Sequence, residues 1–370
     1  MESLVYAEPA SLGIDPEKFK EAEAVLKEEV EKGSAPGAVA LVLYQNKIAY
    51  HYAFGKRALV PEPEEITLDT IYDLASITKC VATTTACMML MEQGLIGLED
   101  PIAKFFPDFA GKEEITIFHL LTHTSGLPAW LPLYQEARSK EDYRKALAES
   151  DLEHQPGAKV VYSCLGFILL GLILEKVAGE ELDAFLQKAL FDPLGMEDTC
   201  FNPKKNFGPE KLLRVAPTEA TEDRGLLRGE VHDENAYCIG GVSGNAGLFS
   251  TAVDLAKFAS MLLSGGVFQG RKILEQKTIE LMTQNHTAPV TPNRGLGWLK
   301  KNPISSGGSL LTDASYGHTG FTGTSMWLDP VLNVAIILLT NQVHPSRHQG
   351  GVAKLRSSFA DAVVSALPKR

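Results

Sequence analysis

Leu74-Ala75-Ser76-Ile77-Thr78-Lys79 is the stretch that decides how this chain of 370 residues is interpreted. Residues three apart lie on one face of a helix, so the side chain of Lys79 can approach the hydroxyl of Ser76. A helix start also offers unpaired N–H groups and a positive dipole end, which suit a nucleophile that generates an oxyanion. Alone the spacing is weak, because an N-capping serine followed by an exposed lysine gives the same pattern.

Two further strings occur where a three-part site needs them. Tyr162-Ser163-Cys164 precedes an apolar helix, and His318-Thr319-Gly320 precedes a strand around Met326. A phenol close to an amine can act as a general base in its phenolate form. A strand edge that ends in glycine can present a bare N–H to an oxyanion. The three strings together favour nucleophilic catalysis.

In this order the strings resemble the serine β-lactamase and penicillin-binding-protein superfamily, especially the branch of class C β-lactamases, D,D-peptidases and family VIII carboxylesterases. Segments 115–128, 247–251 and 295–298 are similar to that branch too, so the likeness spans nearly the whole chain. The resemblance implies an α/β plus all-α, β-lactamase/transpeptidase-like fold. In that fold helices flank an antiparallel sheet and a helical domain is inserted.

The resemblance also implies a role for each motif residue. Ser76 attacks an acyl carbonyl, Lys79 and Tyr162 relay its proton, and Tyr162 then activates the deacylating water. His318 supports the phenolate electrostatically or orients the substrate. The oxyanion hole is formed by the backbone N–H groups of Ser76 and Phe321, and the substrate contacts are made by Thr319, Gly320 and Cys164.

Cys164 is the one departure from the pattern, because many relatives carry asparagine there. A thiol is a weaker hydrogen-bond donor and acceptor than a carboxamide, so recognition of an amide-bearing substrate should suffer. This favours ester hydrolysis. Acyl transfer requires a nucleophile, proton shuttles and oxyanion donors, so neither a metal nor an organic cofactor is predicted.

Mixed α and β patterns at both chain ends enclose a mainly helical middle. A helix is predicted over 16–32, a hairpin over 38–44 and 48–54, strands over 325–329 and 333–340, and a closing helix over 351–367. Helices are predicted in between over 78–93, 117–121, 141–149, 165–177, 182–190, 252–263 and 276–282. We therefore expect a discontinuous sheet domain (1–75 and 290–370), a helical domain (76–289) and the active-site cleft between them.

The composition of the chain limits the classes of partner that we expect it to bind. The excess of 46 acidic over 35 basic residues gives a net charge of -11, which disfavours nucleic acid and anionic lipid surfaces. The apolar run at 166–174 is too short to span a membrane and predicts a buried helix. Five cysteines without a C-x-x-C pair indicate free thiols. With no secretory signal after Met1, we expect a cytoplasmic protein that acts on a small ester or amide, or a periplasmic or extracellular one if a leader was removed.

Several other residues invite a functional interpretation. His119 and His123 have a metal-ligand spacing, but no glutamate completes the motif, so we expect structural roles. The run 231–236 places carboxylates beside a histidine and predicts hydrogen bonds that fix a loop near the cleft. Cys164 is a poor nucleophile, because the apolar turn after it favours a neutral thiol. The glycine-rich run 240–245 lacks G-x-S-x-G, which argues against the α/β-hydrolase fold.

Three functions stay open at this stage. The first is a carboxylesterase for short acyl esters, which Cys164 and the missing leader favour. The second is a D,D-carboxypeptidase or β-lactamase, which requires export and recognition of an amide. The third is a sensor that binds or acylates once without turnover, against which the intact set of Ser76, Lys79 and Tyr162 argues.

Overall fold

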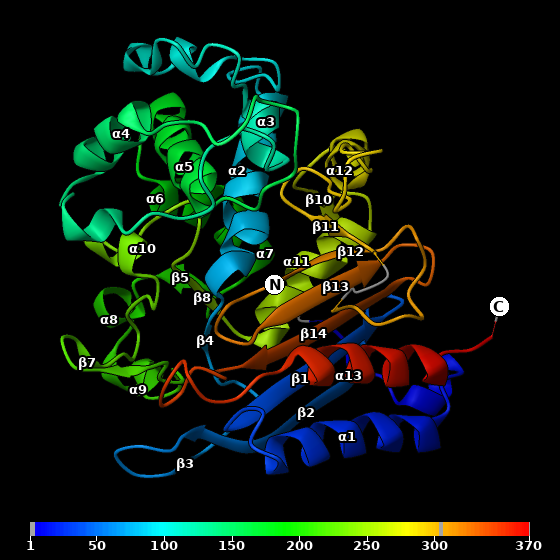
Figure 1. Cartoon of the computed structure of the whole chain (residues 1–370). Coiled ribbons are helices and arrows are strands. Elements are labelled where there is room, and N and C mark those ends of the chain that lie inside the picture. Colours follow the sequence, from blue (N-terminus) through cyan, green and yellow to red (C-terminus); the bar gives the residue numbers. More distant parts are fainter. Residues whose placement is uncertain (1–3, 303–305, 370) are drawn as a thin grey trace.

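A seven-stranded antiparallel sheet lies between two groups of helices in the computed structural model, which describes residues 4–302 and 306–369 (Figure 1). Its strands follow the order β11 (Leu299–Lys300), β12 (Tyr316–Thr319), β13 (Ser325–Asp329), β14 (Val334–Thr340), β1 (Gly37–Tyr44), β2 (Lys47–Ala58) and β3 (Glu64–Glu65). Strands from the two chain ends pair directly, with Val42 of β1 opposite Ile336 of β14. The expected antiparallel sheet built from both ends is confirmed.

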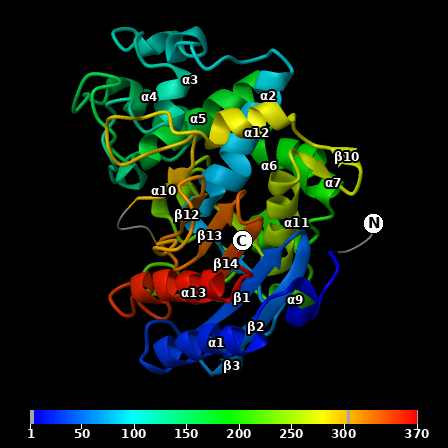
Figure 2. The ribbon, with the colours of Figure 1, turned by 90° about the vertical axis from the view of Figure 1, so that its right-hand side faces the viewer.

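Both faces of the central strand β1 are buried, because helices cover the sheet on either side. Successive side chains of a strand point to opposite faces, and here both faces are apolar. Val39, Leu41 and Leu43 face the large core under the helical region. Ala40 and Val42 face a second core under α1 (Pro16–Glu31) and α13 (Ala353–Ala366). These two helices pack side by side on the outer face (Figure 2).

The other side of the sheet carries the helical region, with α5 at its centre (Figure 1). Its helices are α2 (Thr85–Glu92), α3 (Ile117–Leu121), α4 (Lys140–Glu149), α5 (Cys164–Ala178), α6 (Leu182–Leu186), α7 (Asp192–Leu194), α8 (Pro203–Asn206), α9 (Pro209–Leu212), α10 (Glu234–Cys238), α11 (Ala252–Leu263) and α12 (Gln276–Thr283). Residues Leu165–Leu174 of α5 are all buried, which is typical of a helix that is apolar on every side. The apolar run at 166–174 is thus a core helix, as expected.

Short strands that the sequence patterns did not reveal bring the reactive segment into place. β4 (Tyr72–Asp73) pairs with β8 (Leu248–Ser250), which also pairs with β5 (Cys200–Phe201). Two further hairpins join β6 (Ala220–Thr221) to β7 (Gly225–Leu226) and β9 (Val267–Phe268) to β10 (Arg271–Lys272). Strands of two residues are too short to show an alternating pattern. β4 nevertheless fixes the chain immediately before Ser76.

The segment that carries Ser76 differs from the single α-helix expected over 78–93. Ala75–Ile77 forms a 3-10 turn, Lys79–Thr84 winds as a π-helix, and only Thr85–Glu92 is α-helical. Ala75 has a φ of 46°, a left-handed value that non-glycine residues rarely adopt. π-helical turns and strained residues concentrate at functional sites. A second π-helical turn, Gln187–Phe191, ends the helix expected over 182–190 early.

Three expectations concern the chain as a whole. No helix within residues 4–302 and 306–369 combines the length and the apolar character needed to cross a membrane. The expectation about the leader rests on Met1 and its neighbours, and residues 1–3 lie outside the described residues. The division into 1–75 with 290–370 and 76–289 stays a prediction.

Candidate active site

A cavity of about 610 Å³ brings together the residues that the three motifs singled out. Motif residues on its wall are Ser76, Tyr162, Cys164, His318, Thr319, Gly320 and Phe321. Lys79 is completely buried directly behind Ser76. The start of the π-helix, the start of α5 and the end of β12 therefore converge on one site, although they are far apart in sequence.

Lys79 is held by three acceptors. Its Nζ lies 3.1 Å from Oγ of Ser76, 2.9 Å from the carbonyl oxygen of Asn245 and 3.5 Å from Sγ of Cys164. Burial acts to lower the pKa of Lys79, but the facing groups of Cys164 and Tyr162 outweigh it and raise the pKa above its usual value. An ammonium group has three donors, and the three contacts use all of them. Lys79 is thus a fixed cation beside Ser76.

Tyr162 stands between Lys79 and two histidines. The Nζ of Lys79 lies 4.9 Å from the centre of the Tyr162 ring. The ring of His123 lies 4.7 Å away on one side and the ring of His318 lies 5.9 Å away on another. Burial raises the pKa of Tyr162, and the charge of Lys79 works against that rise. The phenol needs nearby positive charge before it can serve as a base.

Both histidines are neutral at neutral pH. Burial lowers the pKa of His318 well below its usual value, and the charges of Arg294 and Lys79 add to the shift. Nδ1 of His318 is 2.8 Å from the carbonyl oxygen of Thr319, which fixes the proton on Nδ1. Nε2 is buried and finds no partner among the described residues. Of the two roles expected for His318, the lowered pKa favours orientation of the substrate over charge support, and the role stays a prediction.

His123 and His119, which have a metal-ligand spacing, contact different parts of the chain. His119 caps α3 by contacting Thr116, while Nδ1 of His123 accepts a hydrogen bond from the backbone N–H of Ser163 at 3.0 Å. The structural roles expected for both are present. Sequence reasoning nevertheless missed that His123 also packs on Tyr162, because its place beside the site depends on how α3 meets α5.

Arg294 is the second residue that the motifs did not reveal. It is buried, lines the cavity, and places Cζ 5.3 Å from the centre of the Tyr162 ring. Nε and Nη1 have no hydrogen-bond partner within residues 4–302 and 306–369. Arg294 directly precedes segment 295–298, which resembles the superfamily named above. This position is the only sequence signal that could have pointed to Arg294.

The loop after β12 is bonded to the segment before Ser76. The hydroxyl of Thr322 donates to the carbonyl oxygen of Asp73 at 2.7 Å, and that of Thr324 donates to the carbonyl oxygen of Leu74 at 3.1 Å. A Cβ at Gly320 would lie 2.2 Å from Oγ1 of Thr324, so only glycine fits. Arg356 donates to the carbonyl oxygen of Gly320 at 2.7 Å. These bonds fix Ser76 and Phe321 relative to each other.

Aromatic and acidic groups also line the cavity. Phe321 and Trp130 are 57% and 47% exposed. His232 stacks on Phe321 at 5.7 Å and its Nε2 lies 3.0 Å from Glu219. The hydrogen bonds expected of the run 231–236 are present beside the cavity: the backbone N–H of His232 donates to Asp73 at 2.8 Å, and the carboxamide of Asn235 donates to the carbonyl oxygen of Leu131 at 2.9 Å. The run ends in the short helix α10, because Asp233 accepts a hydrogen bond from the backbone N–H of the third helical residue at 2.7 Å.

Comparison with known proteins agrees with this architecture. The sequence profile of the family described as Beta-lactamase matches residues 22–358. A protein of Escherichia coli (strain K12) named "Putative D-alanyl-D-alanine carboxypeptidase" is 33% identical over 377 residues, which cover 92% of this chain and 86% of that protein.

Two solved structures share the fold. "EstCE1, a hydrolase with promiscuous acyltransferase activity" superposes with a TM-score of 0.74 at 24% identity, covering 94% of this chain and 98% of that one. A penicillin-binding protein homolog from Caulobacter crescentus reaches a TM-score of 0.75 at 20% identity, covering 96% and 99%. The matched profile spans most of the chain and the Escherichia coli relative covers nearly all of it, so this chain belongs to the Beta-lactamase family.

Proposed function

We propose that this serine hydrolase cleaves carboxylic esters through an acyl-enzyme on Ser76. The observation that carries the proposal is the position of Cys164, whose Sγ lies 3.5 Å from Nζ of Lys79 on the cavity wall. The side chain at this position therefore offers a thiol, not a carboxamide, to the bound substrate. An ester lacks the amide N–H that a carboxamide oxygen would bind. Binding of an ester is therefore weakened least when a thiol stands in place of the carboxamide.

Acylation starts when Oγ of Ser76 attacks the carbonyl carbon of the ester and the hydroxyl proton passes to the phenolate of Tyr162. The backbone N–H groups of Ser76 and Phe321 stabilise the oxyanion of the tetrahedral adduct. The bond to the alcohol oxygen then breaks, and the leaving alcohol takes the proton from Tyr162. Lys79 keeps its charge beside Oγ of Ser76 and the ring of Tyr162 throughout.

Deacylation reverses these proton transfers with water as the nucleophile. The phenolate of Tyr162 takes a proton from a water molecule, which attacks the carbonyl carbon of the acyl-enzyme. Collapse of the adduct releases the carboxylic acid, and Ser76 regains its proton from Tyr162. Thr319, Gly320 and the neutral His318 line the cavity wall beside the acyl group and orient it.

A second candidate is D,D-carboxypeptidase activity. The specific observation in its favour is that relatives from Escherichia coli and Salmonella agona, which are 33% identical over 92% of this chain, are named "Putative D-alanyl-D-alanine carboxypeptidase". This function needs export to the cell envelope and recognition of a D-alanyl amide. Cys164 weighs against it, because the thiol replaces the group expected to hold that amide.

A substrate panel separates the candidates. Wild type is assayed with a short-chain nitrophenyl ester, a D-alanyl-D-alanine peptide and a chromogenic cephalosporin, beside Ser76→Ala and the control Ser365→Ala outside the cavity. We expect the ester to be turned over fastest, with a loss of about 1000-fold or more in Ser76→Ala and no change in the control. Faster turnover of the peptide would favour the second candidate. Equal ester cleavage by wild type and Ser76→Ala would refute both, and one stoichiometric burst would indicate a sensor.

A further inference from the structure

Arg294 is a buried cation whose charge is not used by the fold. Within the described residues no carboxylate pairs with it, and Nε and Nη1 are buried without an acceptor. A buried charge without a partner is costly, so its retention calls for a negative charge that appears during function. The cavity wall places that charge within reach, because the Tyr162 ring centre lies 5.3 Å from Cζ.

The backbone of Arg294 is held on both sides. Its N–H donates to Oγ1 of Thr287 at 3.0 Å, and its carbonyl oxygen accepts from the backbone N–H of His286 at 2.7 Å. The following glycine lies close to the backbone of Met282, where a Cβ would approach the carbonyl oxygen to 2.5 Å. Arg294 therefore points its guanidinium towards Tyr162 from a fixed position.

The ionisable groups around Tyr162 show why a second cation is needed. The neighbours come from five elements or loops: Lys79 of the π-helix, His123 after α3, Cys164 of α5, Arg294 before β11 and His318 of β12. Both histidines are neutral because burial lowers their pKa values. The charge of Asp233 acts on Lys79. Among residues 4–302 and 306–369, the cations that face the Tyr162 ring are thus Lys79 and Arg294.

We propose that Arg294 is a positioning residue, which stabilises the phenolate of Tyr162 through the positive charge that it holds beside the ring. This rests on the function proposed above, in which Tyr162 receives the proton of Ser76. Arg294 forms no bond in the reaction. It acts through Tyr162, by lowering the free energy of the state in which the phenol has lost its proton.

The expected pH effect has a definite sign. The active enzyme has lost one proton from the coupled pair of Lys79 and Tyr162, and the acidic limb of kcat/KM reports that loss. Removing a neighbouring positive charge disfavours the phenolate and moves the limb to higher pH. A unit charge at this separation, in a medium of effective dielectric constant about 20, shifts such a limb by about one to two pH units.

The first experiment compares pH profiles for a neutral nitrophenyl ester. Arg294→Gln should move the acidic limb up by about one pH unit or more, while kcat at high pH recovers most of the wild-type value. Arg294→Lys keeps the charge and should restore most of the shift even if it packs less well. The control Arg271→Gln removes the same charge from an exposed strand and should leave the limb in place.

A second readout observes the phenol itself. Ultraviolet absorbance titration of each protein, with the titration of its Tyr162→Phe counterpart subtracted, isolates the ionisation of Tyr162. The difference should titrate at higher pH in Arg294→Gln than in wild type or Arg294→Lys. This measurement does not require activity, so the proposal remains testable if ester hydrolysis fails.

Three results would overturn the proposal. Activity that falls equally at all pH values, with an unchanged Tyr162 titration, would assign Arg294 a structural role. A rise in KM confined to carboxylate-bearing esters, with the limb unmoved, would instead make Arg294 a contact for an anionic substrate. A limb that moves equally in Arg271→Gln would reflect overall charge alone.

Discussion

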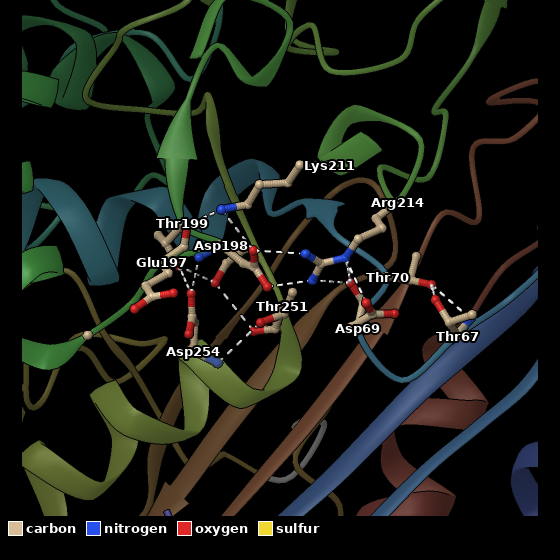
Figure 3. Close-up of polar contacts among 12 residues, drawn as sticks. Thr67, Asp69, Thr70, Glu197, Asp198, Thr199, Lys211, Arg214, Thr251 and Asp254 are labelled. Carbon is tan, nitrogen blue, oxygen red and sulfur yellow. Dashed lines mark hydrogen bonds and ion pairs between the residues drawn. The ribbon is translucent and has the colours of Figure 1, made fainter. Parts of the chain in front are cut away.

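Two polar clusters of this molecule use charge in opposite ways. One joins Asp69, Asp198 and Asp254 to basic side chains outside the cavity (Figure 3). Arg214 pairs with both Asp69 and Asp198, and Lys211 lies 2.9 Å from Asp198. The catalytic cluster instead surrounds Tyr162 with two cations and two neutral histidines.

This difference in charge pairing indicates a different role for each cluster. In the paired cluster each of these carboxylates has a basic partner. The ion pairs of Arg214 connect the loop before β4 to the loop before β5, and the carboxylate of Asp254 ties helix α11 to that second loop by accepting from the backbone N–H of Asp198. In the catalytic cluster Lys79 and Arg294 have no carboxylate partner in the described part of the chain, so their charge can act on the reaction. We therefore expect the first cluster to control stability and the second to control activity.

Loss of Lys79 should have the largest effect. Lys79→Met removes the ammonium from Oγ of Ser76 and from the phenol, and we expect kcat/KM for the ester to fall about 1000-fold or more. Thermal unfolding should show equal or higher stability, because an apolar side chain replaces a fully buried cation. A Lys79→Met variant that keeps its ester hydrolysis but unfolds at a lower temperature than wild type would contradict this expectation.

Loss of Asp254 should lower the stability of the fold and leave ester hydrolysis nearly unchanged. Its carboxylate accepts from the backbone N–H of Asp198 at 2.8 Å and from Lys257 at 2.8 Å. Asp254→Ala removes the acceptor of the Asp198 N–H and the ionic partner of Lys257, which keeps only the carbonyl oxygen of Gly195. The free energy of unfolding, measured by chemical denaturation, should fall by about 3 kcal/mol. The exposed pair of Glu17 and Lys20 is the control, and Glu17→Ala should cost less than about 1 kcal/mol. Ester hydrolysis well below the unfolding temperature should stay near wild type in both variants.

The smallest effect concerns pH. Burial acts to raise the pKa of Asp198, but Arg214 and Lys211 outweigh it and hold the pKa below its ordinary value of 3.8. The resulting stability is present above pH 3.8 and is lost as the pH falls through the lowered pKa of the folded protein. Asp198→Asn should therefore lower the unfolding temperature at pH 7, with the gap to wild type closing in acid. A gap that stays constant with pH would mean that packing, not charge, is responsible.

Sequence patterns predict the catalytic cluster better than its surroundings. Ser76, Tyr162 and His318 each belong to a short string whose chemistry is local, and all three line the cavity. Arg294 and His123 reach the site only through the packing of distant segments, and a single residue without a partner motif leaves no spacing to detect. The continuous apolar run of β1 and the amphipathic spacing of α1 indicate their elements for the same local reason.

The geometry around Ser76 could not be predicted. The strained Ala75 and the π-helix Lys79–Thr84 depend on β4, β8 and the loop after β12, which fix the chain from outside. Such contacts join residues about 170 to 250 positions apart, and neither helix propensity nor hydrophobic periodicity records them.

Identification of the acylated residue tests the central claim most directly. The protein is treated with an active-site fluorophosphonate and, separately, with a slowly hydrolysed ester, and its intact mass and peptide map are measured. The account predicts one adduct per chain, located on Ser76 and absent from Ser76→Ala. An adduct on Cys164 or on another serine, with Ser76 unmodified, would contradict it.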